Sequence, residues 1–333
     1  MRRALLLAAV ALAACAHPPR VVEHPSWPAP PQPARVTYLG GFPDERAVAS
    51  SSSFWRRAFE IIVGIDEEAR RAEEEAILSR PFGLAALGPM LYVADADGAR
   101  VLAVKWAEGT FETITCKTAW KSPMAVAVTA QGVLFVADAG RARLVRIEKG
   151  ECREFGEGLT RPTGLAVSGE RLFVVDPPAH AVVSYGLEGG PALARFGTWG
   201  EGAGQLNFPT AIARRPDGAL LVVDALNFRV VTYAPDGEVL STFGQGGASP
   251  GDFGRPKAVT VDGRGQVYVS DAQYGVVLVF DPAGAWQLAF GGSGREPKNL
   301  SLPAGLAVSG TTLFVADAYH HRVELYELSE VTP

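Results

Sequence analysis

Short runs of apolar residues that end in aspartate recur six times along the chain. They read LYVAD, LFVAD, LFVVD, LLVVD, VYVSD and LFVAD, and they end at Asp95, Asp138, Asp176, Asp224, Asp271 and Asp317. A proline-led apolar segment, such as PFGLAAL or PAGLAV, precedes each run, and a second β-rich run follows it. Repetition at a spacing of 38 to 48 residues predicts one supersecondary unit that is used six times.

Each unit carries the pattern of four short strands. Most copies continue into a fourth run that ends in Phe-Gly, as in VLSTFGQGG, and turn signals such as PDG separate the runs. Four antiparallel strands, repeated six times, predict an all-β, six-bladed β-propeller over residues 35–329. Packing the blades face to face in a closed ring buries the sheet faces that a single blade would expose.

The repeated motif resembles the NHL repeat family. In that family Pro-x-Gly-(Ile/Val)-Ala-Val leads into (Tyr/Phe)-Val-Ala-Asp, then into Asn-x-Arg-(Ile/Val) and Phe-Gly. The resemblance covers residues 80–328, but only the fourth copy, DALNFRV, keeps the full Asn-x-Arg, in Asn227 and Arg229. By this resemblance, arginines that follow four of the aspartates are expected to tie neighbouring blades together; they are Arg100, Arg143, Arg229 and Arg322.

The sixth repeat lacks a fourth strand, because the chain ends after its third. Residues 34–45, ARVTYLGGFPDE, have no blade of their own and read like the fourth strands of the other repeats. We therefore expect this N-terminal strand to pair beside residues 322–328 and close the ring. Without it, two strand edges would be left unpaired.

The alternating strand directions place one set of loops on one face of the predicted disc, which we call the loop face. It comprises the segments after each aspartate and the Phe-Gly loops between blades. Loops on a rigid scaffold commonly carry binding residues. The candidates here are Trp199, Asn227, Phe228, Phe253, Tyr274, Tyr319, His320 and His321. Of these, Trp199, Phe228 and Phe253 are expected to form an exposed apolar patch suited to a protein partner.

A helical insertion is predicted at about residues 53–78, between the closing strand and the first blade. Its first half has apolar residues at helical spacing, and its second half is rich in Glu and Arg. Ser53 is a suitable N-cap. A helix docked on the propeller, a partner-docking helix, a lid over the channel and a membrane-surface helix are the alternatives. The excess of Glu in the second half disfavours the membrane.

The N-terminus has the pattern of a bacterial export signal. Residues 1–14 have a positive start and an apolar run too short for a permanent membrane span. LAAC, which ends at Cys15, resembles the lipobox of bacterial lipoproteins, so Cys15 is the expected lipidation site; ordinary cleavage after Ala16 is the alternative. Ala16 favours the outer membrane by resemblance to enterobacterial sorting rules. Residues 15–34 read as a proline-rich tether.

The polar residues give little sign of catalysis. One aspartate at the same place in every blade suits a structural turn cap that accepts backbone N–H groups. A zinc site needs three or more converging protein ligands, and the propeller holds only His180, His320 and His321. His180 and His320 are the metal-ligand candidates, but they fall short of such a set, so we expect no cofactor.

Two cysteines remain after Cys15. Cys116 and Cys152 are expected on the outer, fourth strands of the first two blades. An oxidising compartment permits a disulfide. The outer strands of adjacent blades diverge, however, and Cα atoms more than about 7 Å apart cannot be bridged. This divergence argues against the bond.

The sequence therefore favours a lipid-anchored envelope protein that acts as a protein-binding or assembly module. The net charge of −5 gives no electrostatic footprint for nucleic acid. The expected partners are membrane lipid, through acylated Cys15, and an envelope protein. NHL-like propellers include metal-dependent lyases, so the alternatives are a lyase or hydrolase-like enzyme and a small-molecule binder. Either would use the central channel, with a lining expected from His180, Tyr274, Tyr319 and His320. A purely structural envelope element is a third hypothesis.

Overall fold

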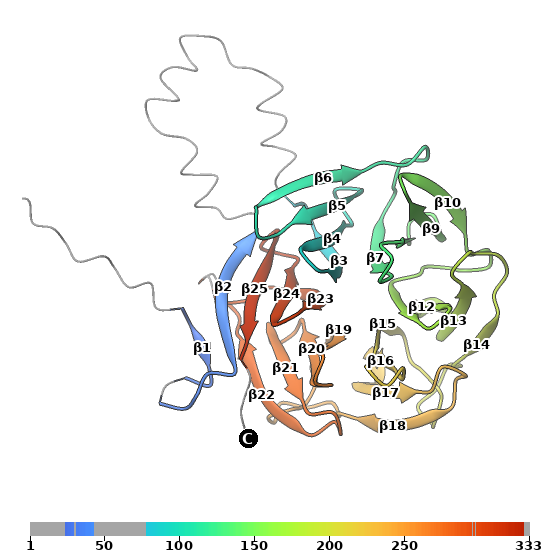
Figure 1. The fold of residues 1–333 in the computed structure, drawn as a ribbon. Helices are drawn as coiled ribbons and strands as arrows, with labels where there is room; N and C mark the ends of the chain where they lie inside the picture. The colour runs from blue at the N-terminus through green and yellow to red at the C-terminus, as the bar shows by residue number, and fades with distance from the viewer. Residues whose placement is uncertain (1–23, 30, 43–77, 295, 297, 330–333) are drawn as a thin grey trace, which may run out of the picture.

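Six antiparallel sheets stand as blades around a central axis in the computed structural model, as Figure 1 shows. The structure describes residues 24–29, 31–42, 78–294, 296 and 298–329. The predicted all-β, six-bladed propeller with four antiparallel strands in each blade is confirmed. Within these residues there is no α-helix, and so no helix that could cross a membrane.

The strands follow the repeats in chain order. Blade one contains β3 (Pro81–Leu87), β4 (Met90–Asp95), β5 (Arg100–Lys105) and β6 (Thr110–Ile114), and blade two contains β7 (Pro123–Val128), β8 (Leu134–Asp138), β9 (Arg143–Glu148) and β10 (Glu151–Phe155). Blade three contains β11 (Gly164–Ser168), β12 (Arg171–Asp176), η1 (Pro177–Ala179), β13 (Ala181–Gly186) and β14 (Ala194–Phe196). Blade four contains β15 (Pro209–Arg214), β16 (Leu220–Asp224), η2 (Ala225–Asn227), β17 (Arg229–Tyr233) and β18 (Val239–Phe243). Blade five contains β19 (Pro256–Val261), β20 (Val267–Asp271), β21 (Val276–Phe280) and β22 (Trp286–Gly291), and blade six contains β23 (Pro303–Ser309), β24 (Thr312–Asp317) and β25 (Arg322–Leu328).

The first strand of each blade lies nearest the axis, and the fourth lies at the rim (Figure 1). The second strands are sandwiched between neighbouring blades, so both of their faces are buried. In β8, for example, every residue from Leu134 to Asp138 is buried. Burial on both faces explains why these strands are continuous apolar runs rather than alternating ones.

The chain closes its ring as predicted. Strand β2 (Val36–Phe42) pairs antiparallel with β25, from Val36 opposite Leu328 to Phe42 opposite Val323. The expected tether is partly wrong, however, because a further strand, β1 (Ser26–Trp27), pairs with the outer edge of β2. No strand pattern is visible here in the sequence, since β1 is only two residues long and lies among prolines.

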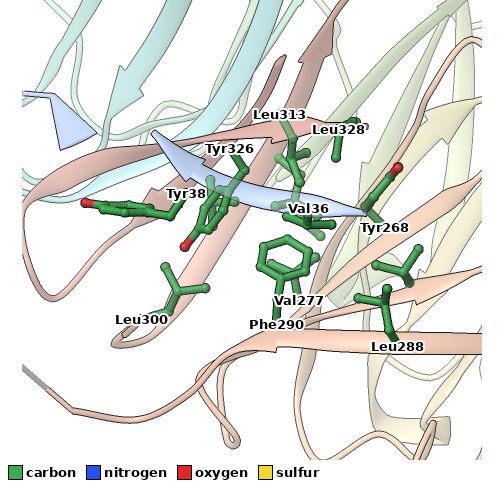
Figure 2. Packing of buried hydrophobic residues seen from close by; sticks show 14 residues of the cluster. Val36, Tyr38, Tyr268, Val277, Leu288, Phe290, Leu300, Leu313, Tyr326 and Leu328 are labelled. Atoms are coloured by element: carbon green, nitrogen blue, oxygen red, sulfur yellow. The ribbon is translucent and has the colours of Figure 1, made fainter. Parts of the chain in front are cut away.

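An aromatic cluster joins the closing blade to blade five. Tyr326 and Phe290 lie with ring centroids 4.8 Å apart, and Tyr38 meets the edge of Tyr326 at 5.5 Å. Figure 2 shows these side chains converging between the two sheets. Trp27 packs on Phe290 at a centroid distance of 5.7 Å and so ties β1 to the core. Apolar burial of this kind is the main driving force that holds blades together.

A buried carboxyl group lies inside the closing blade. Glu324 accepts a hydrogen bond from the Tyr38 hydroxyl at 2.9 Å, and its Oε1 lies 2.5 Å from the Arg322 Nε. Gly41 on β2 provides the space, because a Cβ there would lie 2.6 Å from the Glu324 Oε2. Burial raises the pKa of Glu324 to about 7 and outweighs the lowering effects of the Arg322 charge and the Tyr38 hydrogen bond.

Cys116 and Cys152 form a disulfide, contrary to the expectation from diverging outer strands. Their Cα atoms lie 5.8 Å apart, within bridging range. Cys152 lies on β10, the outer strand of blade two. Cys116 lies beyond the end of β6, in the segment that crosses from blade one to blade two. The divergence of outer strands is therefore irrelevant, because only one of the two cysteines is on such a strand.

Several sequence predictions fall outside the described residues. They are the export signal at 1–14, the lipidation site at Cys15, and the helical insertion at about 53–78 except for Leu78. These stay predictions.

Candidate functional site

The six repeat aspartates are buried beneath the loop face and accept hydrogen bonds from backbone N–H groups. The donors lie 15 to 17 residues earlier, in the segment that leads into the innermost strand, at N···O distances of 2.5 to 3.1 Å. They are Ser79 and Arg80 for Asp95, Lys121 and Ser122 for Asp138, Thr160 and Arg161 for Asp176, Asn207 for Asp224, Gly254 and Arg255 for Asp271, and Ser301 for Asp317. These bonds hold the loop face in place and account for one aspartate in each blade.

Blades four and six depart from this scheme at the residue just before the innermost strand's proline. In the other four blades this residue donates its N–H to the aspartate; it is Arg80, Ser122, Arg161 or Arg255. In blades four and six it is Phe208 or Leu302, and its backbone is left-handed, with φ of 55° and 56°. The side chains of Phe208 and Leu302 are 38% and 46% exposed. Residues other than glycine, Asn and Asp seldom adopt this backbone.

A side chain three residues after the aspartate takes the place of the missing donor. Asn227 donates from Nδ2 to the Asp224 Oδ2 at 2.8 Å, and the His320 Nδ1 lies 2.7 Å from the Asp317 Oδ2. The other four blades have Gly, Arg, Ala or Tyr at this position. Asn227 and His320 thus support the local backbone in the two blades that depart from the pattern.

The histidines are engaged separately. The His180 Nδ1 accepts the Phe208 N–H at 3.2 Å, and the His321 Nδ1 contacts the Ser79 carbonyl oxygen. His320 is held by the aspartate of blade six instead. Across the described part of the chain, no group of three His, Cys, Asp or Glu side chains is arranged to hold a metal ion. The candidate ligands His180 and His320 therefore do not belong to a three-ligand set there.

Among the described residues, five large apolar side chains are exposed on the loop face, and we call this set the apolar loop patch. They are Trp199, Phe208, Leu226, Leu302 and Tyr319, with exposed fractions of 70%, 38%, 56%, 46% and 64%. The first three belong to one hydrogen-bonded group of loops at blades three and four. There the Leu226 N–H donates to the Asn207 carbonyl at 3.0 Å, next to Phe208. The Asn227 Nδ2 donates to the Gly200 carbonyl at 2.9 Å, next to Trp199.

Phe253, expected on the exposed patch, is instead fully buried. The loop after β18 folds back, so that the Phe253 N–H donates to the Gln245 carbonyl at 2.8 Å. Its ring then packs against Phe280 at a centroid distance of 5.5 Å. Phe228 is partly buried in the same apolar cluster. Of the three residues expected to form an exposed patch, only Trp199 is largely exposed.

Three of the repeat arginines lie beside a buried carboxylate of their own blade. Arg229 donates from Nε to the Asp224 Oδ2 at 2.8 Å and from its two terminal nitrogens to three carbonyls of the loop arriving from blade three. It therefore connects neighbouring blades through that loop. Arg100 pairs with Asp95 of its own blade, with Nε and Oδ2 2.9 Å apart, and Arg322 pairs with Glu324 on its own strand.

The central channel contains a cavity of about 60 Å³ between the innermost strands. None of His180, Tyr274, Tyr319 and His320 lines this cavity, which corrects the expected channel lining. Its polar side chains are Thr163, Thr210 and Lys257. The threonine hydroxyls donate to backbone carbonyls of the next blade, Thr163 to Thr210 at 3.0 Å and Thr210 to Lys257 at 2.8 Å. Lys257 is therefore the one charged side chain in the cavity wall, among the described residues.

No protein-family model matches the chain, and no curated protein matches its sequence. Its fold, in contrast, is similar to those of many solved structures. A gluconolactonase from Xanthomonas campestris matches with a TM-score of 0.60 at 22% identity, over 76% of this chain and 87% of that one. Virginiamycin B lyase from Staphylococcus aureus matches with a TM-score of 0.57 at 12% identity, over 75% of this chain and 96% of that one.

An auxiliary nutrient-binding protein from Bacteroides thetaiotaomicron matches with a TM-score of 0.60 at 13% identity, over 76% of this chain and 70% of that one. Such identities establish the architecture alone, and one architecture hosts enzymes and binding proteins alike. The chain is a six-bladed β-propeller similar in fold to a gluconolactonase, a lyase and a nutrient-binding protein.

Proposed function

We propose that the protein is a binding module that docks a partner protein on the apolar loop patch. The observation that carries this proposal is the conformation of Phe208 and Leu302. A left-handed backbone costs a residue with a Cβ roughly 1–2 kcal/mol. In both cases the strained residue carries a large apolar side chain that is partly exposed to solvent. Strain of this kind at an exposed position favours a role in binding over a role in stability.

The chemistry of the patch favours a partner that presents aromatic or aliphatic side chains. Aromatic residues such as Trp199 and Tyr319 contribute strongly to protein interfaces because they bury much apolar area and lose little conformational entropy. The patch side chains come from loops of three different blades, so a partner would span the face rather than enter a single pocket.

The cellular location in this proposal rests on the sequence resemblances. In this proposal the protein is an NHL-type propeller lipoprotein, anchored through acyl chains on Cys15, and the partner is another envelope protein. The residue after the cysteine, Ala16, supports placement at the outer membrane. Acyl anchoring would keep the loop face within reach of membrane-associated partners.

Affinity capture from the native cells tests the docking surface directly. The tagged, detergent-extracted wild type would be compared with a Trp199→Ser/Leu226→Ser variant and with a Leu193→Ser/Leu240→Ser control. The control side chains are 57% and 53% exposed but lie outside the patch. We expect one stoichiometric partner that binds the wild type and the control and is lost at least about 10-fold with the patch variant.

Equal capture of that partner by all three proteins would contradict the docking proposal, as would the lack of any stoichiometric partner. Quantitative mass spectrometry of the captured fractions measures the ratio. Circular dichroism of each variant checks that the propeller remains folded.

The rival enzyme hypothesis is supported by similarity in fold to a gluconolactonase and a lyase, but the described residues provide no three-ligand metal site for it. A metal-dependent lyase or hydrolase needs several ligands that converge on one point, and His180, His320 and His321 are instead each engaged with a different partner.

A further inference from the structure

The rim of the central channel carries positive charge on every second blade. The residue just before the innermost strand's proline is an arginine in blades one, three and five: Arg80, Arg161 and Arg255. The same position is neutral in blades two, four and six: Ser122, Phe208 and Leu302. Because the six blades stand in a ring, these three arginine positions, each just before an innermost strand, are spaced on alternate blades around the channel mouth.

The backbone of this arginine set is fixed. Each of the three donates its N–H to the buried aspartate of its own blade, at 2.6 Å for Arg80, 2.8 Å for Arg161 and 2.9–3.0 Å for Arg255. The innermost strand of the blade then begins at or just after the following proline. The three arginines therefore emerge at equivalent points of the propeller, at the loop-face end of the channel.

Lys257 adds a fourth positive charge just inside the mouth. It lies two residues after Arg255 and lines the channel cavity. Burial lowers the pKa of the Lys257 ammonium, and the charges of Arg255 and Arg80 lower it further. Arg80 belongs to blade one and Lys257 to blade five, so these charges act on each other across the mouth.

The nearest negative charges are the buried aspartates Asp95, Asp176 and Asp271, whose oxygens are already engaged by backbone N–H groups. Among the described residues, Arg80 pairs with Asp97 at 3.4 Å, and that pair is half exposed on both sides. No ion pair joins Arg161, Arg255 or Lys257 to a carboxylate in the described part of the chain. The protein as a whole is acidic, with a net charge of −5, so this concentration of positive charge is local.

We propose that the channel mouth is a binding site for an oxyanion, a phosphate or carboxylate group of a small ligand, held by Lys257 from within and by Arg80, Arg161 and Arg255 from the rim. Guanidinium groups match the geometry of both oxyanions, and an ammonium serves as a point charge for either. The cavity has room for about four water molecules, so it admits the anionic group but not the ligand's body. This inference is independent of the docking proposal.

Calorimetric titration of the purified full-length protein with citrate, and separately with inorganic phosphate, tests the site. Ionic strength is held constant with sodium chloride. We expect saturable binding of at least one probe, weakened about 10- to 100-fold by Lys257→Met, as for loss of a charged hydrogen-bond partner. Lys257→Arg keeps the charge and should bind within about 3-fold of the wild type.

A second variant tests the site even if Lys257→Met fails to fold. Arg161 and Arg255 are exposed, so Arg161→Gln/Arg255→Gln leaves the core intact and should weaken binding about 10-fold in total. Arg153→Gln/Arg171→Gln, at exposed positions on β10 and β12, removes the same two charges outside the channel mouth and should bind normally.

Binding of phosphate alone, of citrate alone or of both supports the site. The probe that binds shows whether the site takes a phosphate group, a carboxylate group or either. The absence of saturable binding by either probe would overturn the proposal. Equal affinities of the wild type, Lys257→Met and the double arginine variant would do the same, because the anions would then bind elsewhere.

Discussion

Neutralising the buried carboxyl group of the closing blade should stabilise the protein at alkaline pH. We expect Glu324→Gln to gain stability relative to the wild type as the pH rises from 4 to 8. Folding raises the pKa of Glu324 from its ordinary 4.5 to about 7. The folded wild type therefore binds more protons than the unfolded chain between these values, and its stability falls as the pH rises through this window.

The expected magnitude follows from the size of the pKa change. A difference of one pKa unit corresponds to about 1.4 kcal/mol, so the wild type should lose about 3 kcal/mol between pH 4.5 and pH 7 through this group. Urea unfolding at several pH values, followed by tryptophan fluorescence, measures the free energy of unfolding of both proteins. The difference between variant and wild type should grow by about 3 kcal/mol and level off above pH 8.

The pH dependence of this difference is more informative than its value at any one pH, because the substitution also alters the pairing of Arg322 by a constant amount. Glu327→Gln is the matched control, since Glu327 lies on the same strand but is exposed. Its difference from the wild type should stay flat. A flat profile for Glu324→Gln as well, or one that slopes the other way, would refute the raised pKa of Glu324 in the folded protein.

Three further outcomes are expected. Replacing Cys116 and Cys152 by serine should lower the free energy of unfolding by about 3–4 kcal/mol, from the 36-residue separation, and reductant should then affect only the wild type in urea unfolding. His320→Ala should lower the free energy of unfolding by about 1–3 kcal/mol, because it leaves a buried Asp317 oxygen without this donor. His321→Ala, at an exposed residue, should lower it by less than about 1 kcal/mol, and equal losses would contradict the role assigned to His320. Cys15→Ser should abolish incorporation of labelled palmitate and release the protein from membranes, and retained label would place the acyl chains elsewhere.

The ring and its closure could be predicted from the sequence because both follow from a strand pattern that repeats six times. Apolar strands that end in buried aspartates identify the blades, and residues 36–42 match the missing fourth strand. The structural role of the aspartates was also predictable, but their partners were not: among the described residues the expected turn cap occurs only at Asp271, and the shared donors lie 15 to 17 residues earlier. What repeats is informative because six independent copies carry the same physical constraint.

The details that failed were those that depend on how a single loop folds. Phe253 looked exposed because it lies in a glycine-rich loop, but that loop folds back and buries the ring against Phe280. Phe208 and Leu302 were overlooked because a left-handed backbone leaves no pattern in the residue itself. Their signal lies elsewhere, in the Asn and His side chains that complete the aspartate contacts only in those two blades.

The short strand β1 has a consequence for how the propeller would sit in the envelope. Only nine residue steps separate Cys15 from His24, where the described chain begins just before β1. At roughly 3.3–3.6 Å for each residue, a fully extended segment spans about 30 Å. If Cys15 carries the acyl chains as proposed, the rim of blade six lies no farther than this from the bilayer. The short tether would then keep the propeller close to the membrane, and a partner of its loop face would have to approach the membrane surface as well.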